Sequence, residues 1–185
     1  DTCTETVCHH RNLGRAVIST GPPRARAAEQ YVARILAVAR SYGQGASDVA
    51  VGDAGGVAAD WAVAQVGTPY VWGGETAGVG FDCSGLVQAA WQRAGIGLPR
   101  VAQAQFDVGP RLPAGAGLAR GDLVFFGGGL SDVTHVGLYL GIEGGQAVMV
   151  DAPHAGAAVR VEAFPTTIGA VWGDDIYLGA TRPTR

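Results

Sequence analysis

Hydrophobic positions recur with two different periods along this chain. Over residues 24–42 and 83–94, apolar side chains return every three to four residues, which predicts two helices. A third, short helix is predicted over 57–65. Short runs rich in β-branched and aromatic residues follow, separated by Gly-rich turns, and they predict strands over 123–126, 135–140, 147–150, 159–161 and 175–178. Helices followed by strands predict an α+β fold with an antiparallel sheet.

Breaks in this pattern divide the chain near residue 56. Residues 1–23 have no periodic apolar pattern and end in a Gly-Pro-Pro sequence that a helix interior does not tolerate. Small and polar residues fill 43–56, as in a linker. We therefore expect an N-terminal tail, helix and linker over 1–56 and a folded domain over 57–185.

The composition fits one folded domain with a short appendage. The chain has 185 residues, 48% of them hydrophobic, and its 30 glycines follow no Gly-X-Y period, which excludes collagen. The net charge is −3 and no run of Arg occurs, so no nucleic-acid partner is expected. No stretch approaches about 18 consecutive apolar residues, so no transmembrane segment is expected. All 13 basic residues are Arg, which indicates a bacterium with a GC-rich genome.

The chain has three cysteines, an odd number. Cys3 and Cys8 can form a local disulfide, which would fit an oxidising compartment, and a tail with free thiols is the alternative. A zinc site that adds His9 and His10 is disfavoured, because adjacent His side chains rarely reach one ion. If the first two cysteines pair, Cys83 remains as a lone thiol and a candidate nucleophile.

Cys83 falls in the first turn of the predicted helix over 83–94, directly after Asp82, which is a suitable N-cap. Unpaired backbone N–H groups and the positive end of the helix dipole stabilise a thiolate at such a position. The thiolate is the attacking form of a cysteine, so the location favours nucleophilic chemistry. A small cysteine buried in the core is the alternative.

Two further residues are candidates for a catalytic group with Cys83. His135 begins a predicted strand, where it is either a base or a half-buried His with ordinary hydrogen bonds. Asp151 follows the next strand, where its carboxylate either orients the imidazole or caps a turn. His154, three residues later, is the competing third member.

Six segments occur in the order that one peptidase family shows. They are 67–74 (GTPYVWGG), 81–87 (FDCSGLV), 98–100 (LPR) with Gln105, 121–126 (GDLVFF), 135–141 (HVGLYLG) and 150–153 (VDAP). Over about residues 57–180 the chain therefore resembles the NlpC-type bacterial cell-wall cysteine peptidases. The resemblance implies a papain-like fold, in which N-terminal helices pack on a central antiparallel sheet and the nucleophile lies at a helix N-terminus.

The resemblance also implies roles for single residues. Cys83 matches the nucleophile and His135 the general base, and Asp151 stands at the position of the third polar residue. Tyr70 matches a tyrosine whose hydroxyl would form the oxyanion hole together with the backbone N–H of Cys83.

Substrate contacts follow from the same resemblance. Asp82 and Ser84 match positions that hold the free amine end of a stem peptide in relatives. The sequence departs from the family in a longer loop over 141–151, in Val101 where relatives mostly carry Thr or Ser, and in three glycines at 127–129 that are expected to lengthen the turn before the strand over 135–140.

The implied activity is hydrolysis of the amide between D-glutamate and meso-diaminopimelate in peptidoglycan stem peptides during cell-wall remodelling. The implied thiol mechanism needs no metal or cofactor, and we expect a secreted or cell-wall-associated monomer. The alternatives are a non-catalytic peptidoglycan-binding module, an enzyme acting on another amide, and a cell-wall hydrolase of a phage or conjugation apparatus. Residues 1–56 either pack behind the domain or lie across its cleft as an inhibitory pro-segment.

Overall fold

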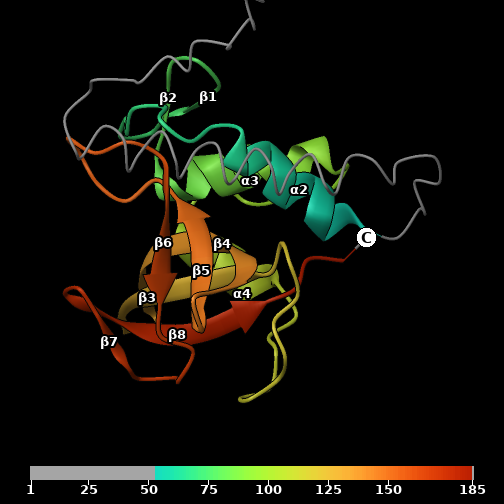
Figure 1. Ribbon diagram of the computed structural model, residues 1–185, viewed down its shortest axis with the longest axis vertical. Helices are drawn as coiled ribbons and strands as arrows, with labels where there is room; N and C mark the ends of the chain where they lie inside the picture. Colours follow the sequence, from blue (N-terminus) through green and yellow to red (C-terminus); the bar gives the residue numbers. More distant parts are fainter. Residues whose placement is uncertain (1–52, 185) are drawn as a thin grey trace, which may run out of the picture. The chain divides into compact units, whose positions relative to one another are not determined.

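The computed structural model describes residues 53–184 of the chain. Their central element is a six-stranded antiparallel sheet (Figure 1). The predicted helix over 24–42, the possible Cys3–Cys8 pair and the possible pro-segment lie outside this part. The described helices are α2 (Ala54–Val63), α3 (Cys83–Arg93) and α4 (Ala102–Val108). The strands are β1 (Glu75–Thr76), β2 (Gly80–Phe81), β3 (Leu123–Gly129), β4 (Asp132–Glu143), β5 (Gln146–Asp151), β6 (Arg160–Phe164), β7 (Val171–Trp172) and β8 (Asp175–Thr181).

The strand order in the sheet is β6-β5-β4-β3-β8-β7, and each neighbouring pair is antiparallel. The short strands β1 and β2 form a separate antiparallel pair. The predicted α+β class with an antiparallel sheet is therefore confirmed. All five predicted strands are present, and each extends beyond its predicted range at one end or both.

Two apolar clusters explain why the β3 segment is apolar without alternation. Leu123 and Phe125 pack in a cluster with residues of α3. Val124 and Phe126 pack in a second cluster, which contains Met149 and several aromatic side chains. A strand that is buried on both faces reads as a continuous apolar run. Helices α2 and α3 lie together across one end of the sheet in Figure 1.

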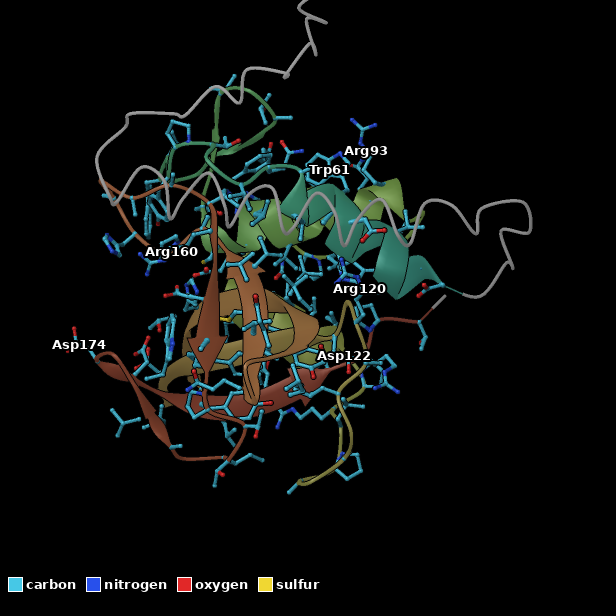
Figure 2. All side chains as sticks on the ribbon, viewed as in Figure 1. Trp61, Arg93, Arg120, Asp122, Arg160 and Asp174 are labelled. Carbon is cyan, nitrogen blue, oxygen red and sulfur yellow. The ribbon has the colours of Figure 1, made fainter. Side chains whose placement is uncertain are left out.

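Side chains of α2 tie this helix to its neighbours. Trp61 meets Phe81 edge to face, with ring centroids 5.9 Å apart, and the guanidinium of Arg93 lies 5.6 Å from the Trp61 ring (Figure 2). Arg120, which precedes β3, forms a 2.6 Å ion pair with Asp60. These contacts hold α2 against α3 and against the segment that leads into β3.

Helix α3 begins as its sequence predicts. The side chain of Asp82 accepts a 2.7 Å hydrogen bond from the backbone N–H of Gly85, which is a helix N-cap. A Cβ at position 85 would collide with the carbonyl oxygen of Gly74, so only glycine lets this first turn approach the preceding loop so closely. No helix within residues 53–184 is long and apolar enough to cross a membrane.

Some elements differ from the sequence prediction. Helix α2 begins at Ala54 rather than at residue 57, because Asp53 caps it by accepting from the N–H of Gly56. Helix α4 was not predicted: its N-cap is Val101, which makes no side-chain hydrogen bond, and its first turn has no acidic residue. The glycines at 127–129 lie in β3 and not in a turn, and irregular pairing with β4 accommodates them.

Candidate active site

Cys83 is the first residue of α3 and is partly exposed. A backbone N–H in the first turn of a helix has no intrahelical partner, so the N–H of Cys83 can bind an incoming anion. Its Sγ lies 4.0 Å from the carbonyl oxygen of Thr134, the residue before His135 in β4. The start of α3 therefore meets β4 at the position of the predicted base.

His135 and Asp151 face each other from adjacent strands. The Nε2 atom of His135 lies 2.9 Å from Oδ2 of Asp151, and the carboxylate is fully buried. In the register of β4 and β5, Leu138 pairs with Val150, which places Gly137 opposite Asp151. A Cβ at Gly137 would lie 2.6 Å from the sulfur of Met149, whereas its distance of 3.4 Å from the Cβ of Asp151 is an ordinary contact. Glycine therefore leaves room for the side chain of Met149 next to Asp151.

The electrostatic environment keeps the His135 imidazole protonated. Burial by itself lowers the pKa of His135, but the hydrogen bonds with Asp151 and Cys83 and the negative charges of both groups raise it to about 10. Because Nε2 is bonded to Asp151, Nδ1 is the ring nitrogen available to the thiol. This arrangement can hold a thiolate–imidazolium pair, which is the resting form of an activated cysteine.

Tyr70 lies beside the start of α3. It forms an isolated parallel bridge with Phe81, and the next residue, Val71, donates a 2.9 Å hydrogen bond to the carbonyl of Phe81. Burial and then the negative charges of Cys83 and Asp82 raise the pKa of the Tyr70 phenol. The hydroxyl therefore stays protonated near neutral pH and can donate a hydrogen bond close to the sulfur.

Asp82 is engaged by donors on both carboxylate oxygens. Oδ1 accepts from the N–H of Gly85 and from Arg100 at 2.9 Å, and Oδ2 accepts from the N–H of Gly73 at 3.0 Å and from Arg100 at 2.7 Å. The hydroxyl of Ser84 lies 3.0 Å from the same guanidinium. The hydrogen bond to Asp82 raises the pKa of Arg100. Arg100 thus neutralises the carboxylate that the sequence resemblance assigns to a substrate amine.

The guanidinium of Arg100 reaches further than Asp82. Its Nε lies 3.1 Å from Glu75 of β1, and Nη2 lies 3.3 Å from the carbonyl oxygen of Gly74. Gln105 of α4 donates to the carbonyls of Ser84 and Pro99, at 3.0 and 2.8 Å. Arg100 and Gln105 both belong to the family motifs found in the sequence. No pattern in the sequence, however, shows which groups they bind.

His154, the competitor for the third position, lies elsewhere. Its side chain is exposed, and its Nδ1 lies 2.9 Å from the carbonyl oxygen of Ala155. The structure therefore brings Asp151, and not His154, to His135. Within residues 53–184, no group of three or more His, Cys, Asp or Glu side chains is arranged to hold a metal ion.

Comparisons with known proteins agree on one family. The profile of the NlpC/P60 family matches residues 67–172, which include Tyr70, Cys83, His135 and Asp151. Over 77 residues the chain is 51% identical to the bifunctional muramidase/DL-endopeptidase CwlT of Bacillus subtilis, covering 40% of this chain and 23% of that protein. Over 111 residues it is 40% identical to the peptidoglycan endopeptidase RipA of Mycobacterium tuberculosis, covering 54% of this chain and 22% of that protein.

A solved structure shows the same fold. The crystal structure of an NlpC/P60 family protein from Bacillus cereus matches with a TM-score of 0.57 and 29% identity, over 73% of this chain and 41% of that chain. The chain spans only about a quarter of the length of the two curated relatives. The likeness therefore concerns the domain that carries the site described above.

Proposed function

Because the chain belongs to the NlpC/P60 family, we propose that it is a cysteine endopeptidase that cuts the stem peptides of bacterial peptidoglycan. The observation that carries this proposal is the 2.9 Å contact between His135 and the buried Asp151, beside Cys83 at the start of α3. A nucleophile, a base and a group that orients the base are the three members of a thiol peptidase site.

The first half of the reaction forms a thioester. The Cys83 thiolate attacks the carbonyl carbon of the scissile amide, and the negative charge moves to the carbonyl oxygen. The hydroxyl of Tyr70 and the backbone N–H of Cys83 donate hydrogen bonds to this oxyanion. The imidazolium of His135 then protonates the leaving nitrogen, the C–N bond breaks, and the amine product departs.

The second half restores the enzyme. His135, now neutral, takes a proton from a water molecule, whose oxygen attacks the thioester. The tetrahedral intermediate uses the same two donors, and its collapse releases the carboxylic acid and the Cys83 thiolate. Asp151 keeps the Nε2 proton of His135 in place throughout, so that Nδ1 always faces the reacting atoms.

The scissile bond in this proposal joins D-glutamate to meso-diaminopimelate. The relative CwlT is named a DL-endopeptidase and RipA a peptidoglycan endopeptidase, and both names fit a bond of this kind. Such a substrate lies outside the cytoplasmic membrane, so the protein would act as a secreted or wall-associated enzyme. The proposed nucleophile, base and orienting carboxylate all come from residues 53–184 of one chain, so the proposed site needs no second copy, which supports action as a monomer.

The proposed roles of Asp82 and Ser84 follow from their contacts. Both groups already bind Arg100, so a substrate amine would have to share Asp82 with the guanidinium. We therefore propose that Asp82 mainly positions the start of α3, and that Ser84 offers its hydroxyl to the same network.

Digestion of purified peptidoglycan tests the proposed bond. The products are separated and identified by mass spectrometry, with wild-type protein and with Cys83→Ala purified in the same way. We expect wild type to release fragments that begin with meso-diaminopimelate and Cys83→Ala to release none. Binding of peptidoglycan by wild type without any cleavage would replace the proposal with a non-catalytic binding module. Cleavage at a different amide would keep the mechanism but change the substrate bond.

A further inference from the structure

The indole of Trp172 covers one face of the His135 imidazole. The two ring centroids lie 5.2 Å apart and the planes differ by 22°, which is a stacked arrangement. Trp172, which belongs to β7, also lies against Phe126 of β3, with ring centroids 4.4 Å apart. His135 pairs with Phe126 in the register of β3 and β4, so the three rings form one aromatic group around the imidazole.

We infer that Trp172 is a positioning residue for His135: its indole holds the imidazole in the plane that joins Cys83 to Asp151 and stabilises its protonated form. This inference rests on the proposed function, because the role of Trp172 is to orient His135, the proposed base, and to stabilise its protonated form. The role is distinct from packing alone, because the face of an indole attracts a cation placed over it.

A hydrogen bond fixes the orientation of the indole. Its Nε1–H donates to the carbonyl oxygen of Ala163 in β6, at 3.2 Å. Strands β6 and β7 are the two opposite edges of the six-stranded sheet, so this bond joins the edges of a curled sheet (Figure 1). The ring of Trp172 is thus held from its own backbone on one edge and from Ala163 on the other.

A second contact ties the same hairpin to the strand of the base. Trp172 pairs with Asp175 across the β7–β8 turn, and the carboxylate of Asp175 accepts a 2.7 Å hydrogen bond from the hydroxyl of Thr134. Thr134 immediately precedes His135 and offers its carbonyl oxygen to Cys83 at 4.0 Å. The hairpin therefore supports both the ring and the backbone of the proposed base.

The other charged groups around His135 lie on elements other than β7. Cys83 faces the imidazole from α3 and Asp151 faces it from β5. Glu162 of β6 lies next to Asp151, and its carboxylate forms a 2.8 Å ion pair with Arg160. Figure 2 shows Arg160 beside β6. Burial and then the charge of Asp151 raise the pKa of Glu162. Asp175, the first residue of β8, is linked to the strand of His135 through Thr134, and β3 contributes only the uncharged ring of Phe126.

The test measures the alkylation rate of Cys83 by iodoacetamide between pH 4 and pH 10, in the full chain, by mass spectrometry of the peptide that contains Cys83. This readout needs no peptidoglycan, so its outcome is separate from the outcome of the digestion experiment. Trp172→Leu removes the aromatic face, whereas Trp172→Phe keeps a face but removes the Nε1–H. Val171→Ala changes the exposed neighbour on the same strand and is the matched control.

We expect Trp172→Leu to move the acidic midpoint of the alkylation profile upward by about half to one pH unit, because the thiolate–imidazolium pair forms less readily. Trp172→Phe should lie between Trp172→Leu and wild type, and Val171→Ala should match wild type. Identical profiles for Trp172→Leu and wild type would overturn the inference and leave Trp172 as a packing residue.

A measurement on the unchanged protein covers the case in which Trp172→Leu does not fold. In wild type, the ring protons of His135 lie over the indole and should resonate well upfield of their usual positions in the proton NMR spectrum. Ring protons of His135 at ordinary chemical shifts would show that the stack does not persist in solution, and would also overturn the inference.

Discussion

Nε2 of His135 donates a hydrogen bond to the fully buried carboxylate of Asp151, over 2.9 Å. A carboxylate at 0% exposure that accepts from an imidazole stabilises the imidazolium and fixes which ring nitrogen faces the thiol.

Asp151→Asn should lower kcat by about 10²- to 10⁴-fold, because an amide does not stabilise the imidazolium and can hold the wrong tautomer. The measurement is the turnover of a soluble stem peptide at fixed pH. His154→Ala is the matched control: its side chain is exposed and bonded to a neighbouring backbone carbonyl, so its kcat should equal that of wild type. Loss of turnover in His154→Ala with normal turnover in Asp151→Asn would reverse the assignment.

The stability of the fold should depend on pH through His135. Its pKa rises from 6.5 in the unfolded chain to about 10 in the folded protein. The folded state then binds the proton more tightly, so this contribution is complete below about pH 6.5 and disappears as the pH rises toward about 10. Urea unfolding of wild type at several pH values should show this decline, and Asp151→Asn should show a smaller one. An equal decline in both proteins would contradict the assigned cause.

Arg100→Gln should destabilise the fold by about 2 kcal/mol. Removing one partner of a buried ion pair leaves the other charge uncompensated, which costs about 3–5 kcal/mol, and partial exposure of the pair reduces this value. The side chain of Arg100 is 30% exposed and that of Asp82 is 12% exposed. Arg100→Lys should recover only part of the loss, because an ammonium cannot bind both carboxylate oxygens in parallel. Urea unfolding at pH 7 checks both variants, and a full recovery in Arg100→Lys would refute the paired geometry.

Tyr70→Phe should lower kcat by about 10²- to 10³-fold with little change in KM. An oxyanion donor acts on the charge that develops in the transition state, and loss of one such donor typically has an effect of this size. The phenyl ring keeps the packing of Tyr70 against the core, so the thermal midpoint should stay close to wild type. Normal kcat in a folded Tyr70→Phe protein would assign the donor role elsewhere.

Local signals in the sequence account for the elements that were predicted correctly. Helix α3 has an N-cap at Asp82 and apolar residues at helical spacing, and both cues lie within a few residues of each other. Strands β3 to β5 are rich in β-branched and aromatic residues, and turns directly follow β3 and β4. Helix α4 lacked such cues, because Val101 offers no capping side chain and only seven residues are helical.

The contacts of the site were harder to predict, because they depend on register and on residues far apart in the chain. The sequence favoured Asp151 over His154 for the third position but left both open, and the pairing of β4 with β5 brings Asp151 to His135. The contact of Arg100 with Asp82 spans 18 residues. Strand β7 has two residues, too few for any pattern, so Trp172 gave no sign of its contact with His135.

The proposed function requires the sulfur of Cys83 to attack the substrate. Its most direct test is the hydrolysis rate of a defined stem peptide, L-alanyl-γ-D-glutamyl-meso-diaminopimelate with its N-terminus acylated, followed by chromatography and mass spectrometry. We predict that wild type releases meso-diaminopimelate and that Cys83→Ala releases none above the uncatalysed rate, while its circular dichroism spectrum and thermal midpoint match wild type. Release of meso-diaminopimelate by Cys83→Ala at the wild-type rate would contradict the account.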